Sequence, residues 1–161
     1  MLKVGDIAPK FILPDQKGSE FSLTEKLRDG ALILFFYPAD FTPGCTKEVC
    51  AIRDIHEEIL SVGMQVVGVS PQNRASHSRF SDEYDLPYTL ICDPDKVAIK
   101  MYDADGPMGF GVRRITYLVS QGQKIQGALC ADLKINKHEE FIKKAIVLRE
   151  TAGMKVRNED A

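Results

Sequence analysis

The feature that most constrains the fold of this chain is an apolar run at residues 31–36 that leads into a turn bounded by proline. The run is rich in Phe and Ile and is ended by Pro38, a pattern typical of a buried strand. Thr42 then stands where a helix N-cap belongs, and Pro43 stands at the first helical position, where its missing N–H costs nothing. The sequence therefore predicts a buried strand, a short loop and a helix that begins at Thr42.

Cys45 falls in the first turn of this predicted helix. The unpaired backbone N–H groups and the positive end of the helix dipole favour the thiolate, which is the nucleophilic form of cysteine. The alternative is a buried structural cysteine, a common fate of a free thiol. Packing alone does not require Thr-Pro-Gly-Cys between a strand and a helix, so we predict a reactive sulfur at Cys45.

Strand and helix patterns alternate along the rest of the chain. The predicted strands lie at residues 31–36, 64–69, 89–92, 114–119 and 124–129, after a small N-terminal β-hairpin of residues 11–13 and 20–23. The predicted helices lie at residues 42–62, 72–84, 95–102 and 137–149. This order indicates an α/β fold of thioredoxin-like arrangement, with a mixed central sheet flanked by helices. We expect residues 1–149 to form a single domain and residues 150–161 a polar C-terminal tail.

The bulk properties exclude several classes of protein. A formal net charge of −2 gives no general attraction to nucleic acid or to an anionic membrane, and no apolar segment is long enough to span a bilayer. Polar residues, glycine and proline interrupt the first ten residues, so a secretory signal is not expected and the cytoplasm is the default location. Four cysteines are too few for a disulfide scaffold, which favours catalysis or redox sensing.

Residues 38–45 also fit a longer pattern, Pro-x-x-x-Thr-x-x-Cys. On this motif the chain resembles the peroxiredoxins, and a second cysteine at position 50 makes it most similar to the PrxQ or bacterioferritin comigratory protein (BCP) branch. Further matching segments follow in order at residues 4–11, 53–54, 69–71, 84–88, 93–95 and 114–119. The resemblance implies a thioredoxin-like fold and a thiol-dependent peroxidase.

The resemblance assigns roles to residues near the predicted reactive sulfur. Cys45 would be the peroxidatic cysteine and Cys50 the resolving cysteine, while the Thr42 hydroxyl bonds sulfur and peroxide, and Pro38 shields the pocket. On an ideal helix, Cα atoms five residues apart lie about 8–9 Å from each other. A disulfide needs Cα atoms within roughly 7 Å, so a Cys45–Cys50 bond requires the first turns of the helix to unwind. Gly44, a poor helix former, would ease that unwinding.

Two neighbouring arginines compete for the role of binding the anion. Strand alternation puts Arg114 and Thr116 on one face and Arg113 on the other. The family pattern selects Arg114 to stabilise the thiolate and hold the peroxide oxygen, which leaves Arg113 facing solvent. Glu48 would orient Arg114 by its place in the motif, although an exposed helix glutamate is nearly as plausible.

Other polar residues carry weaker predictions. Arg53 and Asp54 either brace the loop or form a surface ion pair. Residues 106–111 match no phosphate-loop spacing and are expected to form a mobile loop near the active site. The three histidines stand among polar neighbours on helical segments and suggest no site; they are His56, His77 and His138.

Taken together, the residues and the resemblance predict a peroxidase that reduces hydrogen peroxide and alkyl hydroperoxides. A sulfenic acid on Cys45 would condense with Cys50, and a thioredoxin-type dithiol would reduce the disulfide, with no metal, haem, flavin or nucleotide as cofactor. A Cys92 or Cys130 resolving thiol, an external thiol, and a monomer or a homodimer all remain open. The rival functions are a peroxide sensor or thiol–disulfide oxidoreductase, although Cys-x-x-Cys is missing, and a metal site of Cys45, Cys50 and His56.

Overall fold

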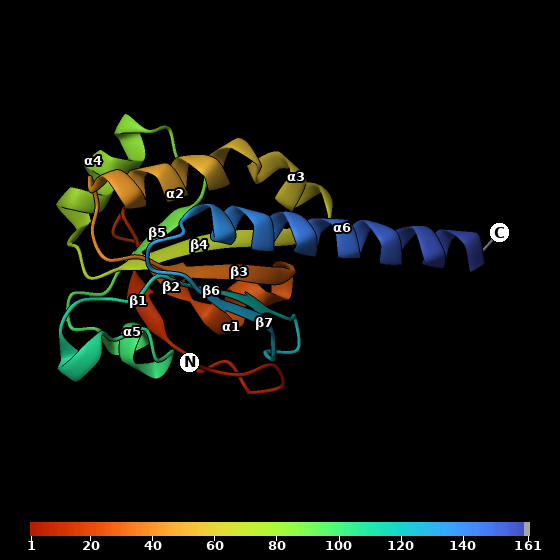
Figure 1. The fold of residues 1–161 in the computed structure, drawn as a ribbon, viewed down its shortest axis with the longest axis horizontal. Helices are drawn as coiled ribbons and strands as arrows, with labels where there is room; N and C mark the ends of the chain where they lie inside the picture. The colour runs from red at the N-terminus through yellow and green to blue at the C-terminus, as the bar shows by residue number, and fades with distance from the viewer. Residues whose placement is uncertain (160–161) are drawn as a thin grey trace.

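A computed structural model describes residues 1–159 of the chain, with side chains up to Ala152. A five-stranded sheet of strand order β5-β4-β3-β6-β7 forms the centre (Figure 1). Its strands are β3 (Ala31–Phe36), β4 (Met64–Ser70), β5 (Thr89–Cys92), β6 (Ile115–Val119) and β7 (Ile125–Cys130). The first three are parallel, whereas β6 runs antiparallel to both β3 and β7. The mixed sheet predicted from the sequence is confirmed.

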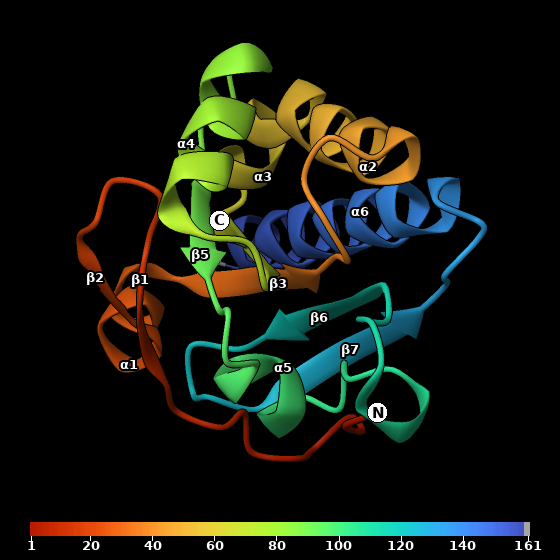
Figure 2. The same ribbon diagram turned by 90° about the vertical axis from the view of Figure 1, so that its left-hand side faces the viewer.

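Helices cover one face of this sheet and a second group of elements covers the other (Figure 2). On the first face lie α2 (Pro43–Asp54), α3 (His56–Ser61), α4 (Arg74–Glu83) and α6 (Asn136–Glu159). The other face carries α5 (Val97–Met101), α1 (Leu23–Lys26) and the 3-10 turn η1 (Leu27–Asp29). The residues of β3 alternate between two hydrophobic cores, one on each face of the sheet. All six residues of the strand are buried, which explains why the run is apolar without interruption.

The predicted N-terminal hairpin is present as β1 (Ile12–Pro14) and β2 (Glu20–Ser22), which pair antiparallel beside the main sheet. The short helix α1 that follows was not predicted from the sequence. Its N-cap is Ser22, whose side chain accepts a hydrogen bond from the Glu25 N–H. A helix of four residues is too short to show a periodic apolar pattern, and the cap is the only local signal for it.

The single helix predicted at residues 42–62 is wrong in one respect, because the chain bends at Ile55 and divides it into α2 and α3. Ile55 has φ −110° and ψ 11°, and its N–H bonds to the Ile52 carbonyl. Both Ile55 and Ile59 are buried in the core on this face of the sheet. The bend is therefore compatible with burial of both side chains, and the apolar spacing alone did not reveal it.

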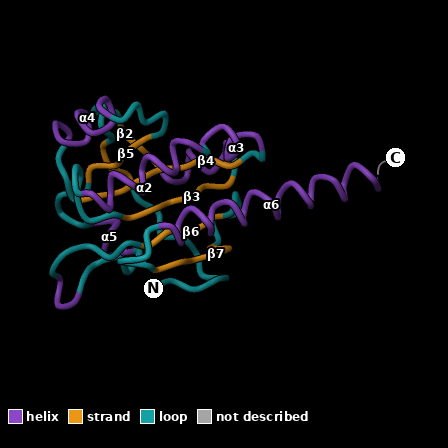
Figure 3. Tube along the Cα trace, turned by 45° about the horizontal axis from the view of Figure 1, so that its top comes forward, coloured by secondary structure: helices purple, strands orange, loops and turns teal. Residues whose placement is uncertain are grey.

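The closing helix also differs from the prediction, which ended it near Arg149. Helix α6 continues to Glu159, and its C-terminal half extends past the strands (Figure 3). Residues 150–159 contain no proline and mostly good helix formers, so nothing local stops the helix. The division into a domain of residues 1–149 and a tail remains a prediction. Across the described residues, no helix is long and apolar enough to cross a membrane.

Candidate active site

Cys45 lies in the first turn of α2, as the sequence predicts. Thr42 is the N-cap residue, with an extended backbone of φ −78° and ψ 148°, and Pro43 occupies the first helical position. The Cys45 side chain is only 1% exposed and belongs to the core between the sheet and the helices. The sulfur is therefore shielded from bulk solvent while it lies close to the backbone N–H groups at the N-terminus of α2.

The Thr42 hydroxyl does not bond the sulfur in this structure. It donates instead to the Ala39 carbonyl at 3.0 Å, within the β3–α2 loop (residues 37–42). The Thr42 carbonyl in turn accepts from the Thr46 N–H at 2.9 Å. Thr42 thus joins the loop to the first turn of α2, and the hydroxyl oxygen keeps lone pairs for a further donor.

Arg114 connects Cys45 to Glu48. Its Nη1 lies 3.4 Å from the Cys45 Sγ and 2.5 Å from the Glu48 Oε2. Arg114 is 6% exposed and Glu48 only 2%, so this contact is buried. Arg113 faces the opposite way and forms a half-exposed ion pair with Asp132 at 3.0 Å, as strand alternation predicts. The structure therefore brings together the sulfur, the arginine and the glutamate that the sequence singled out.

The Glu48–Arg114 pair is not fully satisfied. Burial raises the pKa of Glu48 to about 7, and the guanidinium of Arg114 beside it opposes this rise. Burial alone would lower the pKa of Arg114, but Glu48 and Cys45 outweigh it and raise that pKa. Among the described residues, nothing donates to the Glu48 Oε1. One buried oxygen of the carboxylate that Arg114 links to Cys45 is thus left without a donor.

Cys50 is half-buried on the same helix as Cys45, and all four cysteines lie within the described residues as free thiols. Burial raises the pKa of Cys50, while Arg53 beside it works in the opposite direction. Arg53 pairs with Asp54 at 3.0 Å on the surface and also donates to the Tyr84 carbonyl at 2.8 Å. Arg53 therefore forms a surface ion pair and also acts as a brace, joining α2 to the end of α4.

The other two cysteines lie on strands of the central sheet. Cys92 ends β5 and directs its Sγ toward the Asp15 carbonyl of the N-terminal hairpin, 3.7 Å away. Cys130 ends β7 and is half-buried. Burial raises the pKa of both thiols, that of Cys92 to about 11. In the folded state both are therefore poor nucleophiles at neutral pH.

The rival metal site finds no support in the geometry. Within residues 1–159, no group of three or more His, Cys, Asp or Glu side chains is placed to hold a metal ion. Cys45, Cys50 and His56 therefore do not form such a group. The His56 ring instead lies near Tyr88, with ring centroids 5.9 Å apart.

Two histidines that the sequence analysis set aside, His77 and His138, are fully buried, although their neighbours in the sequence are polar. His77 contacts Asp40 at 2.7 Å and the Ile91 carbonyl at 2.9 Å. His138 contacts the Thr116 hydroxyl at 2.7 Å and the Ala131 carbonyl at 2.9 Å. His77 stands three and four residues before Phe80 and Ser81, which are also buried, so helical spacing could have indicated its burial.

A pocket of about 500 Å³ opens beside Arg114. Pro38 forms one wall, and residues 106–107 and 110–114 with Asp132 form the rest. The segment at residues 106–111 thus lies next to Arg114, as predicted, and contains the 3-10 turn η2 (Pro107–Gly109). Phe110 is 78% exposed, so an apolar side chain stands at the edge of this pocket.

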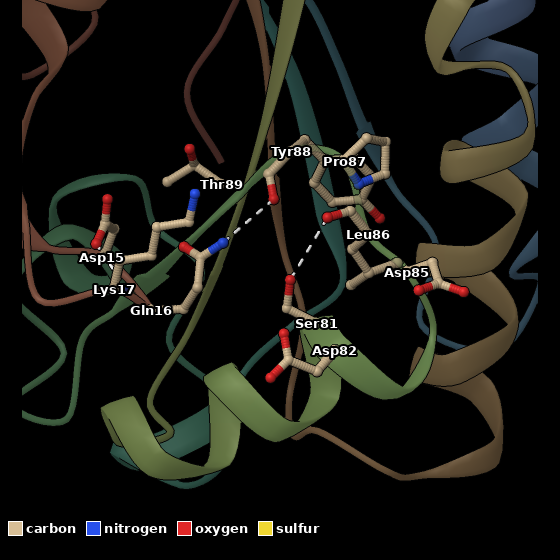
Figure 4. A pocket seen from close by; sticks show the side chains of 10 residues that line it. All are labelled: Asp15, Gln16, Lys17, Ser81, Asp82, Asp85, Leu86, Pro87, Tyr88 and Thr89. Atoms are coloured by element: carbon tan, nitrogen blue, oxygen red, sulfur yellow. Dashed lines mark hydrogen bonds between the residues drawn. The ribbon is translucent and has the colours of Figure 1, made fainter.

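A second pocket, of about 480 Å³, lies between the N-terminal hairpin and the turn that joins α4 to β5 (Figure 4). Its lining is mostly polar, and none of its residues was predicted as a site residue. They are Asp15, Gln16, Lys17, Ser81, Asp82, Asp85, Leu86, Pro87, Tyr88 and Thr89. This pocket therefore carries no part of the candidate chemistry.

Comparisons with known proteins agree with this geometry. A model of the AhpC/TSA family matches residues 4–128. Peroxiredoxin Bcp of Escherichia coli K12 is 35% identical over 147 residues, which cover 88% of this chain and 93% of the relative. Chloroplastic peroxiredoxin Q of Arabidopsis thaliana is 41% identical over 124 residues, 76% of this chain and 56% of that protein. The crystal structure of peroxidoxin BcpB from Mycobacterium tuberculosis has a TM-score of 0.86 and 30% identity, and covers 92% of this chain and 98% of its own.

Proposed function

The chain belongs to the AhpC/TSA family and is a thiol peroxidase of the peroxiredoxin Bcp and Q type, and we propose that Cys45 is its peroxidatic cysteine. The observation that carries this assignment is the position of the Cys45 sulfur, in the first turn of α2 and 3.4 Å from a buried arginine. Dipole, backbone N–H groups and guanidinium all favour negative charge at this point.

In the first step the Cys45 thiolate attacks one oxygen of the hydroperoxide, and the O–O bond breaks. Sulfur supplies the electron pair and becomes a sulfenic acid, while the other oxygen leaves, takes a proton and departs as water or an alcohol. Arg114 stabilises the charge on the departing oxygen, and the Thr42 hydroxyl positions the peroxide. Pro38 forms a wall of the adjoining pocket and, having no N–H, offers no donor to water there.

Glu48 is a positioning residue in this proposal. Its Oε2 accepts from the Arg114 Nη1 and so holds the guanidinium against the sulfur. With a pKa near 7, it gains or loses a proton close to neutral pH. Its protonation therefore alters how much of the positive charge of Arg114 is available to the sulfur.

In the second step the Cys50 thiol condenses with the sulfenic acid, releasing water and forming the Cys45–Cys50 disulfide. Because an intact helix holds Cα atoms five residues apart at about 8–9 Å, the first turns of α2 must open for this bond to form. The raised pKa of Cys50 keeps it as a thiol while it is half-buried, and opening exposes it. A dithiol protein of thioredoxin type then reduces the disulfide by exchange and is itself oxidised.

We infer that both hydrogen peroxide and alkyl hydroperoxides are substrates. A pocket of about 500 Å³ beside Pro38 and Arg114 greatly exceeds what hydrogen peroxide needs. Val112 and Phe110 give it apolar surface for an organic group. The cytoplasm, where dithiol reductants are kept reduced, is the proposed place of action.

One experiment tests the catalytic cycle directly. The reduced protein receives one equivalent of hydrogen peroxide, free thiols are alkylated, and the peptides are mapped by mass spectrometry. We expect a loss of two hydrogens with Cys45 linked to Cys50, and a trapped sulfenic acid on Cys45 in the Cys50→Ser variant. The Cys92→Ser and Cys130→Ser variants serve as matched controls and should behave as the wild type.

Two other results would contradict the proposal. A sulfenic acid on Cys45 with Cys50 still free in the wild type would remove the resolving role from Cys50. An unreacted Cys45 would remove the peroxidatic role altogether, whichever other cysteine is oxidised.

A further inference from the structure

The β3–α2 loop is held from behind by one buried carboxylate, that of Asp40. Its Oδ1 accepts from the Tyr37 hydroxyl at 2.7 Å. Its Oδ2 accepts from the Ser76 hydroxyl at 2.7 Å and faces the His77 Nδ1 at the same distance. The side chains of Asp40 and His77 have no exposed surface. We call Asp40 with these three partners the Asp40 anchor.

The hydrogen-bond partners of His77 fix the number of protons in the anchor. The His77 Nε2 lies 2.9 Å from the Ile91 carbonyl, which can only accept, so this nitrogen carries a proton. The His77 Nδ1 faces a carboxylate oxygen, so a second proton must lie between Nδ1 and Oδ2. Tyr37 lies farther from Nδ1, at 3.5 Å, and donates to Asp40 instead. The Asp40–His77 contact is therefore a strong hydrogen bond in the buried interior, whichever of the two side chains carries the shared proton.

This anchor connects elements that are distant in sequence. Asp40 belongs to the loop before α2, Ser76 and His77 belong to α4, and Ile91 belongs to β5. Helices α2 and α4 stand on the same face of the sheet (Figure 2). The loop that leads to Cys45 is therefore fastened to a part of the core that contains none of the proposed catalytic residues.

The next residue of the loop, Phe41, has a backbone φ of +63°. An aromatic residue rarely adopts this left-handed conformation, and it persists only where the surroundings enforce it. The Phe41 ring packs on Phe80 with centroids 5.0 Å apart, and the Arg79 guanidinium lies 5.8 Å from the ring centroid. The anchor and this packing hold the strained turn from both sides.

We propose that the Asp40 anchor positions Cys45 by keeping the β3–α2 loop closed, and that it opposes the opening of α2 that brings Cys45 to Cys50. The inference rests on the proposed function, because it assumes that α2 opens in each cycle. The hydrogen bond from the Thr42 hydroxyl to the Ala39 carbonyl spans Asp40. Fixing Asp40 therefore also fixes Thr42, the N-cap residue of α2. Asp40 and His77 are thus positioning residues that contact neither sulfur nor substrate.

The proposal predicts unequal effects on the two half-reactions. Suppose that the loop is open for a small fraction of the time and that disulfide formation requires the open state. A variant that weakens the anchor then multiplies the open fraction, while the closed fraction, which reacts with peroxide, barely changes. Disulfide formation becomes faster and peroxide attack stays constant, whereas general damage to the fold would slow peroxide attack.

The test compares two serines on α4. Ser76→Ala removes one donor to the Asp40 carboxylate, while the matched control Ser81→Ala removes a hydroxyl that donates to the Leu86 carbonyl at 3.5 Å. We expect Ser76→Ala to raise the rate of Cys45–Cys50 disulfide formation about tenfold, the size of one hydrogen bond to a charged group. The rate of sulfenic acid formation should change less than twofold. Ser81→Ala should leave both rates within twofold of the wild type.

Amide hydrogen exchange of the reduced protein gives a second readout that needs no peroxide chemistry. Exchange at residues 41–49 should rise about tenfold in Ser76→Ala and stay unchanged in Ser81→Ala. Asp40→Ala should raise it further. Asp40→Asn, which keeps the shape and one accepting oxygen but replaces the other with an NH2 donor, should fall between the wild type and Asp40→Ala.

The outcomes separate this inference from the proposed function. Equal exchange and equal disulfide rates in the two serine variants would overturn the anchor, as would parallel slowing of both half-reactions in Ser76→Ala. If Cys45 is not oxidised in the wild type, the proposed function fails, and the exchange experiment still decides whether the anchor holds the loop.

Discussion

Two buried carboxylates, Asp40 in the β3–α2 loop and Glu48 in α2, differ in how completely their hydrogen bonds are satisfied. Asp40 uses both oxygens, with partners on Tyr37, Ser76 and His77. Glu48 uses one oxygen on Arg114, and its Oε1 has no donor among the described residues. The Asp40 carboxylate thus has hydrogen-bond partners on both oxygens, whereas in the described part of the chain the Glu48 carboxylate, paired with the arginine that contacts the sulfur, has a partner on only one.

The difference matches the roles that we propose for the two carboxylates. A fully satisfied network in a low-dielectric interior is rigid, which suits a group that fixes the position of a loop. A buried oxygen without a donor costs free energy, and burial raises the pKa of the Glu48 carboxyl group to about 7. Such an incomplete pair can take up or release a proton while charge moves at Cys45. The contrast teaches that burial alone does not distinguish these two carboxylates, whereas the number of unmet hydrogen bonds does.

The largest effect is expected from removing the cation of the incomplete pair. Arg114→Ala should slow sulfenic acid formation on Cys45 by about 10²–10³-fold, the usual loss when one group that stabilises the developing charge is removed. Arg113→Ala, which breaks only the half-exposed pair with Asp132, should stay within twofold. Stopped-flow measurement of peroxide attack checks both variants. Equal losses in the two would mean that the Arg114–Cys45 contact has no special role.

A smaller effect concerns the proton of Glu48. Its pKa in the folded protein, about 7, lies above its ordinary value of 4.5, so the folded state binds this proton more tightly than the unfolded state. The resulting stability is fully present below pH 4.5, falls as the pH rises toward 7 and is absent above that, a change of about 3 kcal/mol.

Denaturant unfolding between pH 4.5 and 8 measures this change. Glu48→Gln should lack that part of the slope, while Glu57→Gln, which alters an exposed side chain of α3, should keep the wild-type profile. A Glu48→Gln profile that runs parallel to the wild type would show that Glu48 is ionised throughout this range.

A third test stabilises helix α2, so its effect on disulfide formation is the opposite of weakening the Asp40 anchor. A Cβ at Gly44 would lie 2.7 Å from the Ile135 Cδ1 and 3.3 Å from the Arg114 Nη2, so the substitution is made in an Ile135→Val background. There Gly44→Ala should favour the helix by about 1 kcal/mol and slow disulfide formation about fivefold. Ile135→Val alone is the control. Faster disulfide formation in the double variant would contradict the requirement for unwinding.

The smallest effect is expected at the brace between α2 and α4. Arg53→Ala removes the hydrogen bond to the Tyr84 carbonyl and should lower the free energy of unfolding by about 1 kcal/mol. Asp54→Ala breaks only the surface ion pair and should cost less than about 0.5 kcal/mol. Thermal unfolding compares the two. A larger loss for Asp54→Ala would mean that the ion pair, rather than the brace, carries the stability.

Local signals were enough to predict the strand, the loop and the helix that carries Cys45. The apolar run of β3, Thr42 as N-cap and Pro43 at the first helical position all act within a few residues, so they can be recognised without the rest of the chain. Strand alternation likewise separated Arg114 from Arg113. The bend at Ile55 and the length of α6 were missed, because apolar spacing does not mark a bend within a buried face or the end of a polar helical segment.

The sequence by itself therefore determined the fold class, the position of Cys45 at the start of α2 and the face of the strand that carries Arg114, because strand and helix periods decide which side chains share a face. Only the tertiary structure decided which polar groups are buried and how they are paired. Asp40 and His77 stand 37 residues apart, on a loop and on a helix, and no local pattern connects them. A buried polar side chain is tolerated only when its partners are in place, and those partners meet only after the chain has folded.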